Sequence, residues 1–194
     1  MPNAIGARLE RRLLPTFFMG AGLKSATSKQ DMERMRDLAA ATAKHLGTPR
    51  QSPFCADIIH AGSGHRLVRR LNAVAAEHDP TSHAEVRAIR AATKRLKSVS
   101  LKGYVLYTTC EPCPMCMAAA LWAGIDRVVY GATISDAARF CSQIYTSARQ
   151  LQRRSDLRCE VAGPVERDAC VALFEDPRMA EAMKLWRHKA PSRA

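Results

Sequence analysis

Two short stretches decide the fold of this chain: Thr81-Ser82-His83-Ala84-Glu85, and Cys110-Glu111-Pro112-Cys113-Pro114-Met115-Cys116. Apolar residues recur at helical spacing behind each stretch, which predicts helices over 83–96 and 114–123. Pro114 suits a first-turn position, where its missing N–H costs nothing. Helix starts offer unpaired amide donors and positive potential, which favour thiolate over thiol. The two stretches therefore predict one site built from two helix starts.

A candidate zinc ligand set lies in these stretches, formed by His83, Cys113 and Cys116. Catalytic zinc sites combine three protein ligands with an open position for water, whose pKa the metal lowers to about 7. Glu85, two residues beyond the imidazole, is placed to carry a proton between water and a substrate. The sequence thus predicts one Zn²⁺ ion, with Glu85 as the catalytic proton carrier.

Two other metal sites remain open at this point. A closed structural zinc site could use Cys110 as its fourth ligand, but it would leave the His-x-Glu pair without a role. The spacing of Cys110, Cys113 and Cys116 also resembles the opening of an iron–sulfur run. That run needs a further cysteine three residues on, and residue 120 is alanine. Both alternatives are less favoured than catalytic zinc.

Helices alternate with strands after an opening hairpin, which favours an α/β sandwich with helices on both faces of a mixed sheet. We expect one domain over 28–194 and an N-terminal extension over 1–27. A helix is expected over 28–46 with Ser28 as its cap. The strands are expected over 54–59, 66–74, 103–108, 127–130 and 159–162, with further helices within 133–154 and on both sides of Pro177.

Composition indicates a soluble protein that resides in a reducing compartment, which predicts a cytoplasmic location. The 194 residues carry a net charge of +12, which is spread along the chain, and no apolar run approaches the ~20 residues of a membrane span. The seven cysteines do not form a disulfide framework. Arg11-Arg12 and the apolar stretch 13–23 faintly resemble a twin-arginine export signal, but Pro15 interrupts the stretch and no cleavage site follows.

The two motifs together resemble a known family. His-x-Glu followed by Pro-Cys-x-x-Cys is similar to the signature of the cytidine deaminase-like zinc deaminases. The resemblance covers roughly residues 31–175, and 79–86 looks like the purine-acting branch, which guanine deaminases and tRNA adenosine deaminases share. It implies a three-layer α/β/α sandwich with a five-stranded mixed sheet, and a homodimer.

The same resemblance assigns residues to the substrate. Asn72 stands eleven residues before His83, in the place of the family's base-reading asparagine, although a turn asparagine is the plainer alternative. Ala84 and Pro112, beside the zinc ligands, are further substrate-binding candidates. Asp136 is a possible second proton carrier, or else a helix cap. Trp122 lies at an apolar position of its helix, where packing in the core is favoured over a role as a pocket wall.

Within the purine-acting branch the sequence favours one reaction. Ala88-Ile89-Arg90 and Ser135-Asp136-Ala137-Ala138 look like bacterial guanine deaminase, and the glycine-rich segment of tRNA adenosine deaminases is missing. Guanine deaminases carry acidic residues after the second stretch, whereas this chain has Arg139-Phe140-Cys141-Ser142-Gln143. The resemblance implies hydrolytic removal of the amino group of a purine base such as guanine.

Three alternatives remain open. The first is deamination of adenosine to inosine in tRNA, which the positive charge favours. The second is deamination of a different small substrate, such as a cytosine compound. The third is a zinc scaffold without catalysis, and the presence of Glu85 argues against it.

Overall fold

The computed structural model describes residues 27–187, with side chains as far as Met183. The predicted N-terminal extension, with Arg11-Arg12, lies outside the described residues apart from residue 27. No described helix is both long enough and apolar enough to cross a membrane.

Five strands form one mixed sheet in the order β2-β1-β3-β4-β5. The strands β1 and β2 form an antiparallel hairpin, β1 also pairs antiparallel with β3, and β3, β4 and β5 run parallel. Their bounds are Cys55–His60 for β1, Arg66–Leu71 for β2, Tyr104–Cys110 for β3, Arg127–Ala132 for β4 and Glu160–Ala162 for β5.

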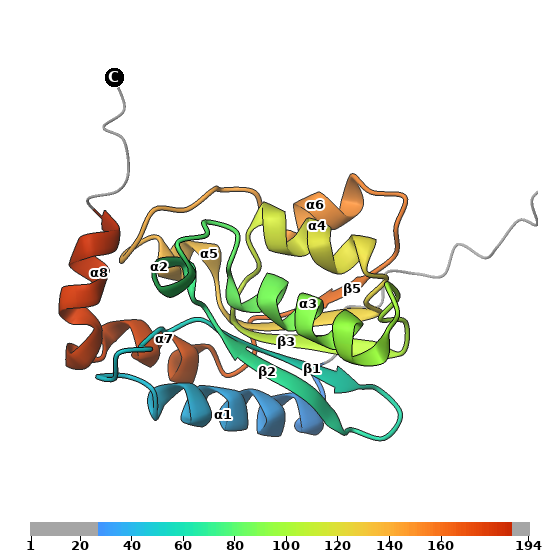
Figure 1. The fold of residues 1–194 in the computed structure, drawn as a ribbon, viewed down its shortest axis with the longest axis horizontal. Helices are drawn as coiled ribbons and strands as arrows, with labels where there is room; N and C mark the ends of the chain where they lie inside the picture. The colour runs from blue at the N-terminus through green and yellow to red at the C-terminus, as the bar shows by residue number, and fades with distance from the viewer. Residues whose placement is uncertain (1–26, 188–194) are drawn as a thin grey trace, which may run out of the picture.

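Helices cover both faces of this sheet, so the predicted three-layer α/β/α sandwich with a five-stranded mixed sheet is confirmed (Figure 1). One face carries α1 (Lys29–Ala43) and α7 (Arg167–Glu175), and the other carries α3 (Ala84–Leu96), α4 (Pro114–Trp122) and α6 (Ala148–Arg153). Each face has its own apolar cluster. The shorter elements are α2 (Val74–Glu77), α5 (Ile134–Ala137), the 3₁₀ turn η1 (Pro177–Met179) and α8 (Ala180–Arg187).

Local chemistry sets the ends of α1. The Ser28 hydroxyl accepts from the Asp31 amide while the Asp31 carboxylate accepts from the Ser28 amide, which is a complete capping box. The predicted cap is therefore confirmed. The helix ends at Ala43 rather than at Leu46, because the last amides bond three residues back and tighten the chain into turns. Leu46 stays buried even so.

The second strand of the hairpin is shorter than predicted. It ends at Leu71, and the chain then forms α2 instead of continuing toward Val74 as a strand. The Asn72 amide donates to the Phe54 carbonyl, and the Asn72 side-chain oxygen accepts from the Val74 amide. This side-chain bond turns the backbone out of the sheet and starts α2.

The helix α4 is apolar on nearly every side. Its end is as expected except for the position of one side chain, that of Trp122. It ends before Gly124, which has a φ of +67° and so occupies the left-handed position that a helix end favours. Trp122, which we expected to pack in the core, is 81% exposed. The side chain of Met117, on the same helix, fills the core instead.

Candidate metal centre and pocket

The three predicted ligands come from the starts of α3 and α4. His83 is the cap residue of α3 and Cys113 is the cap residue of α4, while Cys116 lies in the first turn of α4. Neither side chain makes a capping hydrogen bond at its helix start. The two helices pack side by side on one face of the sheet (Figure 1). This packing brings the two stretches together across 30 residues of sequence.

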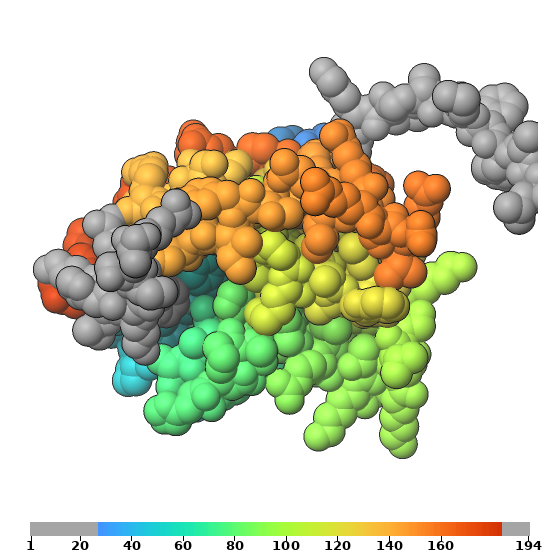
Figure 2. Space-filling model, turned by 90° about the horizontal axis from the view of Figure 1, so that it is seen from above, coloured from blue at the N-terminus to red at the C-terminus, as the bar shows by residue number. Residues whose placement is uncertain are grey.

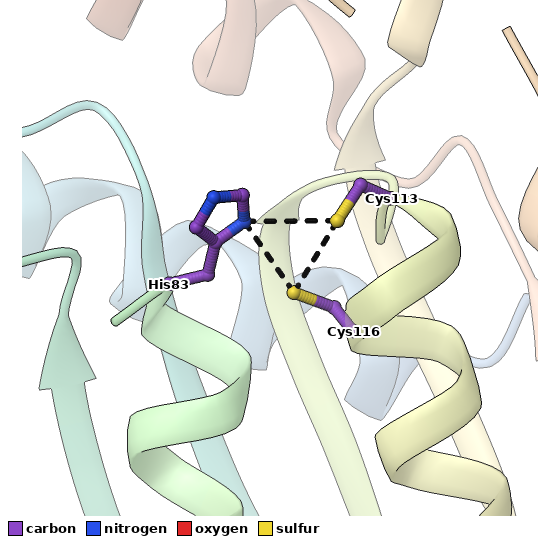
Figure 3. A group of neighbouring side chains, drawn as sticks. All are labelled: His83, Cys113 and Cys116. Atoms are coloured by element: carbon purple, nitrogen blue, oxygen red, sulfur yellow. Dashed lines mark hydrogen bonds between the residues drawn. The ribbon is translucent and has the colours of Figure 1, made fainter. Parts of the chain in front are cut away.

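Figure 3 shows the imidazole of His83 and the two sulfurs at the corners of a small triangle. The Sγ atoms of Cys113 and Cys116 lie 3.6 Å apart, and the His83 Nδ1 atom lies 3.6 Å and 3.5 Å from them. Tetrahedral zinc, with Zn–S of about 2.3 Å and Zn–N of about 2.0 Å, requires ligand separations of about 3.8 Å and about 3.5 Å. The donor set therefore fits one tetrahedral zinc ion.

The electrostatics of this triangle favour a thiolate. A hydrogen bond from the Cys116 thiol, together with one from His83, lowers the pKa of the Cys113 thiol to about 4. The bond to Cys113 in turn raises the pKa of the His83 imidazole. A low thiol pKa next to an imidazole marks a ligand or nucleophile rather than an inert structural cysteine.

Glu85 lies in the first turn of α3 and is buried. Burial raises the pKa of its carboxyl to about 7, and the negative charge of Cys113 adds to the effect. A carboxyl with this pKa takes up and releases protons near neutral pH, which suits general acid–base catalysis.

A pocket of about 440 Å³ opens onto the Glu85 carboxyl and the neighbouring metal ligands. Its wall includes the ligands His83 and Cys113, the carboxyl group of Glu85, and Asn72. Seen from above (Figure 2), the orange segment before α6 and the green segment around α2 border a hollow on this face. A pocket of this size and mostly apolar lining suits a small organic ligand held by a few polar groups.

The pocket also contains residues that the sequence did not assign to it. These are Phe54, Val74, Ala75, Cys110, Glu111 and residues 141–144. The departure of 139–143 from the guanine deaminase pattern was a signal for the last of them. The others are ordinary apolar or strand-end residues in the sequence, and only the fold brings them to the pocket.

Four predicted site residues do not line the pocket: Ala84, Pro112, Cys116 and Asp136. Ala84 and Pro112 are buried beside lining residues but are not part of the wall. Asp136 caps α5 by accepting from the amide of Thr133, and its other oxygen accepts from Arg167. The geometry therefore favours the cap over a second proton carrier for Asp136, because both of its oxygens are engaged away from the pocket.

The sequence also matches a known protein family. The model for the cytidine and deoxycytidylate deaminase zinc-binding region matches residues 28–132. The chain belongs to this deaminase family. The match includes every residue of the triangle, and Zn²⁺ is the cofactor of this chain.

Two relatives of this chain with different names illustrate the similarity. The chain is 46% identical to a guanine deaminase of Bacillus subtilis over 86 residues, which cover 44% of this chain and 54% of that one. It is 35% identical to a tRNA-specific adenosine deaminase of Agrobacterium fabrum over 113 residues, covering 55% and 73%. The chain thus spans about half the length of the guanine deaminase.

A solved structure agrees with the fold. The guanine deaminase of Nitrosomonas europaea superposes with a TM-score of 0.67 at 22% identity, covering 75% of this chain and 82% of the other chain. At this identity the similarity concerns the fold alone.

Proposed function

We propose that this deaminase hydrolytically removes the exocyclic amino group of a nucleobase, most favourably a purine such as guanine. The observation that carries the proposal is the buried carboxyl of Glu85 beside the His83–Cys113–Cys116 triangle in a 440 Å³ pocket. The 46% identity to a relative that is named a guanine deaminase supports the choice of guanine.

In the proposed mechanism, His83, Cys113 and Cys116 hold the zinc ion. When bound, zinc acidifies a water molecule and so supplies a nucleophile at neutral pH. Glu85 takes the proton that the water releases and delivers it to the ring nitrogen beside the reacting carbon. A C–O bond forms, Glu85 moves the remaining proton of the added hydroxyl group to the departing amino group, and the C–N bond breaks. The products are ammonia and the oxo form of the base.

Asn72 is the proposed reader of the base. The amide of Val74 donates to its side-chain oxygen at 2.8 Å, so the side chain is fixed with its NH₂ group as the remaining donor. A substrate that offers an acceptor, such as a ring nitrogen or a carbonyl oxygen, matches this donor. Substrate contacts from Ala84 and Pro112 are part of the same proposal.

Ammonia release tests the proposal directly. The purified zinc-loaded chain would be assayed with guanine, adenine, cytosine, their nucleosides and a transcribed tRNA. We expect turnover of guanine or a closely related amino-purine, at a higher kcat/KM than for any nucleoside. Turnover of cytosine alone would overturn the choice of purine, and no ammonia from any member of the panel would overturn the deaminase itself.

A second candidate function is the conversion of adenosine to inosine in tRNA. The net charge of +12 would suit a polyanionic substrate, and relatives named tRNA-specific adenosine deaminases match the chain. The even spread of the charge along the sequence, and the absence of the glycine-rich segment, make it the less favoured candidate.

We further propose that the protein forms a homodimer through the outer face of α4. A helix that is apolar on all sides is normally buried, yet Trp122 at the end of α4 is exposed and Met115 and Ala118 are only half-buried. A second copy of the chain would cover these side chains. We also propose a cytoplasmic location, since none of the seven cysteines forms a disulfide, as expected in a reducing compartment.

A further inference from the structure

The wall of the pocket opposite α2 is formed by the segment 138–147, which links α5 to α6. Residues 141–144 of this segment line the pocket, and the side chain of Gln143 is the longest polar one among them. The four lining residues carry no charged side chain, so the polar contacts that they offer to a ligand are neutral.

The hydrogen bonds of Gln143 with the described residues leave its side-chain oxygen available. Its Nε2 atom donates to the sulfur of Cys141 at 3.2 Å. Its Oε1 atom makes no hydrogen bond with the described residues, and the side chain is only half-buried at the pocket wall. An amide held by its nitrogen presents its oxygen as an acceptor. Gln143 therefore offers an acceptor to a ligand, while Asn72 offers a donor.

A residue that does not belong to the segment holds it in place. The buried carboxylate of Glu111 accepts from the Ile134 amide at 3.2 Å through Oε2, and from the Ala148 amide at 3.0 Å through Oε1. Ile134 begins α5 and Ala148 begins α6. One side chain thus fixes both ends of the stretch that contains Gln143, and each bond is charge-assisted.

Aromatic packing fixes the segment at a third point. The Phe140 ring stacks on that of Phe174 on α7, with centroids 5.6 Å apart and planes 25° apart. The ring of Phe54, which also lines the pocket, meets Phe174 edge-on at 5.1 Å. The backbone that leads to Gln143 is therefore constrained before any ligand enters.

We propose that Gln143 is a specificity-determining residue, which accepts from a ring N–H of the base, and that Glu111 is the positioning residue that holds it there. This inference rests on the proposed function. Guanine carries an N–H beside the carbon that bears its reacting amino group, whereas 2,6-diaminopurine has a bare nitrogen at that place. An acceptor at the wall therefore favours guanine over 2,6-diaminopurine.

The test compares these two bases with the zinc-loaded full chain. Gln143→Ala should lower the ratio of kcat/KM for guanine to that for 2,6-diaminopurine by about three- to tenfold, the effect of one neutral hydrogen bond. The matched control is Gln152→Ala on α6, which removes the same side chain outside the pocket lining and should leave the ratio unchanged.

Glu111→Gln tests the positioning role. The new amide can accept only one of the two backbone bonds and turns a donor toward the other N–H, so one end of the segment is released. We expect KM for guanine to rise with a smaller change in kcat, and the substrate ratio to fall as in Gln143→Ala. Misfolded protein lowers the apparent kcat for both bases equally, so it cancels from the ratio. Glu33→Gln, in an exposed ion pair with Lys29 on α1, is the control.

A double-mutant cycle tests whether Glu111 and Gln143 act on the substrate ratio together. If Glu111 acts through Gln143, then Glu111→Gln should change the ratio no further once Gln143 is alanine. Full additivity of the two effects, or an unchanged ratio in Gln143→Ala with both bases turned over, would overturn this inference and leave the proposed function standing. Failure of the unmodified chain to turn over either base would overturn both.

Discussion

The carboxylate of Asp31 on α1 accepts two hydrogen bonds from the guanidinium of Arg127 on β4, at 2.7 Å and 3.0 Å. The Tyr107 hydroxyl donates to the same carboxylate at 2.7 Å. Asp31 is only 1% exposed, so this ion pair ties a helix layer to the sheet from within. It lies on the face of the sheet opposite α3 and α4.

Acid should weaken this ion pair selectively. Burial opposes the charged form of Asp31, but hydrogen bonds from Arg127, Tyr107 and Ser28 hold its pKa well below the usual value. A lowered folded-state pKa contributes stability above the unfolded pKa of about 3.9, and this contribution is lost as pH falls further. We expect Asp31→Asn to lower the free energy of unfolding by about 3–5 kcal/mol at pH 7.

Urea unfolding at several pH values checks this expectation. The difference between the unmodified protein and Asp31→Asn should stay constant from pH 7 to about 5 and shrink below about 4. Glu33→Gln, in an exposed pair with Lys29 on the same helix, should change stability by no more than about 1 kcal/mol. A difference that grows as pH falls would contradict the account.

Metal content should follow the triangle of ligands. The purified chain should hold about one zinc ion, because the three donors form one site. Cys113→Ala combined with Cys116→Ala should remove the ion, as measured by atomic emission. The control is Cys159→Ala, which removes a buried thiol just before β5. This variant should retain the ion. Zinc at full occupancy in the double variant would refute the ligand assignment.

Glu85→Gln should separate metal binding from catalysis. Because Glu85 moves protons and is not a ligand, zinc content should persist while kcat falls by about 10²–10⁴-fold. The isosteric amide keeps the shape of the side chain, so a loss of turnover reports its proton chemistry. Glu33→Gln serves again as the control. Near-normal turnover in Glu85→Gln would transfer the proton role to another group.

Salt should distinguish a free base from a polynucleotide. A protein that neutralises six or more phosphates loses affinity by about 10³-fold or more between 50 and 200 mM salt, because bound counterions are released. A neutral purine releases none, so we expect kcat/KM for guanine to stay nearly flat over this range. Inosine that forms in tRNA at low salt and disappears at moderate salt, with no turnover of a free base, would favour the second candidate function.

Trp122 should report the proposed dimer. The unmodified chain should sediment as a dimer at micromolar concentration, and Trp122→Lys should shift it to a monomer by placing a charge in the apolar face of α4. Val99→Lys changes another exposed apolar residue, outside α4, and should leave the dimer intact. A monomeric unmodified chain would exclude the dimer, and a dimeric Trp122→Lys would exclude this face.

Much of the fold could be predicted because its signals are local. The Ser28 cap, the proline at the start of α4 and the glycine after it each act within a few residues, and the structure has all three. The approach of His83 to Cys113 and Cys116 was predictable for a different reason. Their chemistry makes sense only when they share one ion.

The remainder depends on contacts that are distant in sequence. The four-residue helix α2 is too short to show a period, and it arises from the Asn72 side chain turning onto the backbone. The exposure of Trp122 could not be predicted because α4 is apolar all round. Its sequence pattern therefore does not show which side of the helix faces the core. The position of 138–147 depends on Glu111, which lies 23 and 37 residues from the amides it holds.

The anchoring of both ends of 138–147 by Glu111 makes this stretch a natural module for engineering. Grafts from related enzymes can vary in length and composition between Ile134 and Ala148 while the attachment points stay where the carboxylate holds them. The metal ligands lie on other elements and would not shift with the graft. A library randomised only between these two anchors would therefore explore new substrate preferences on an unaltered reaction centre.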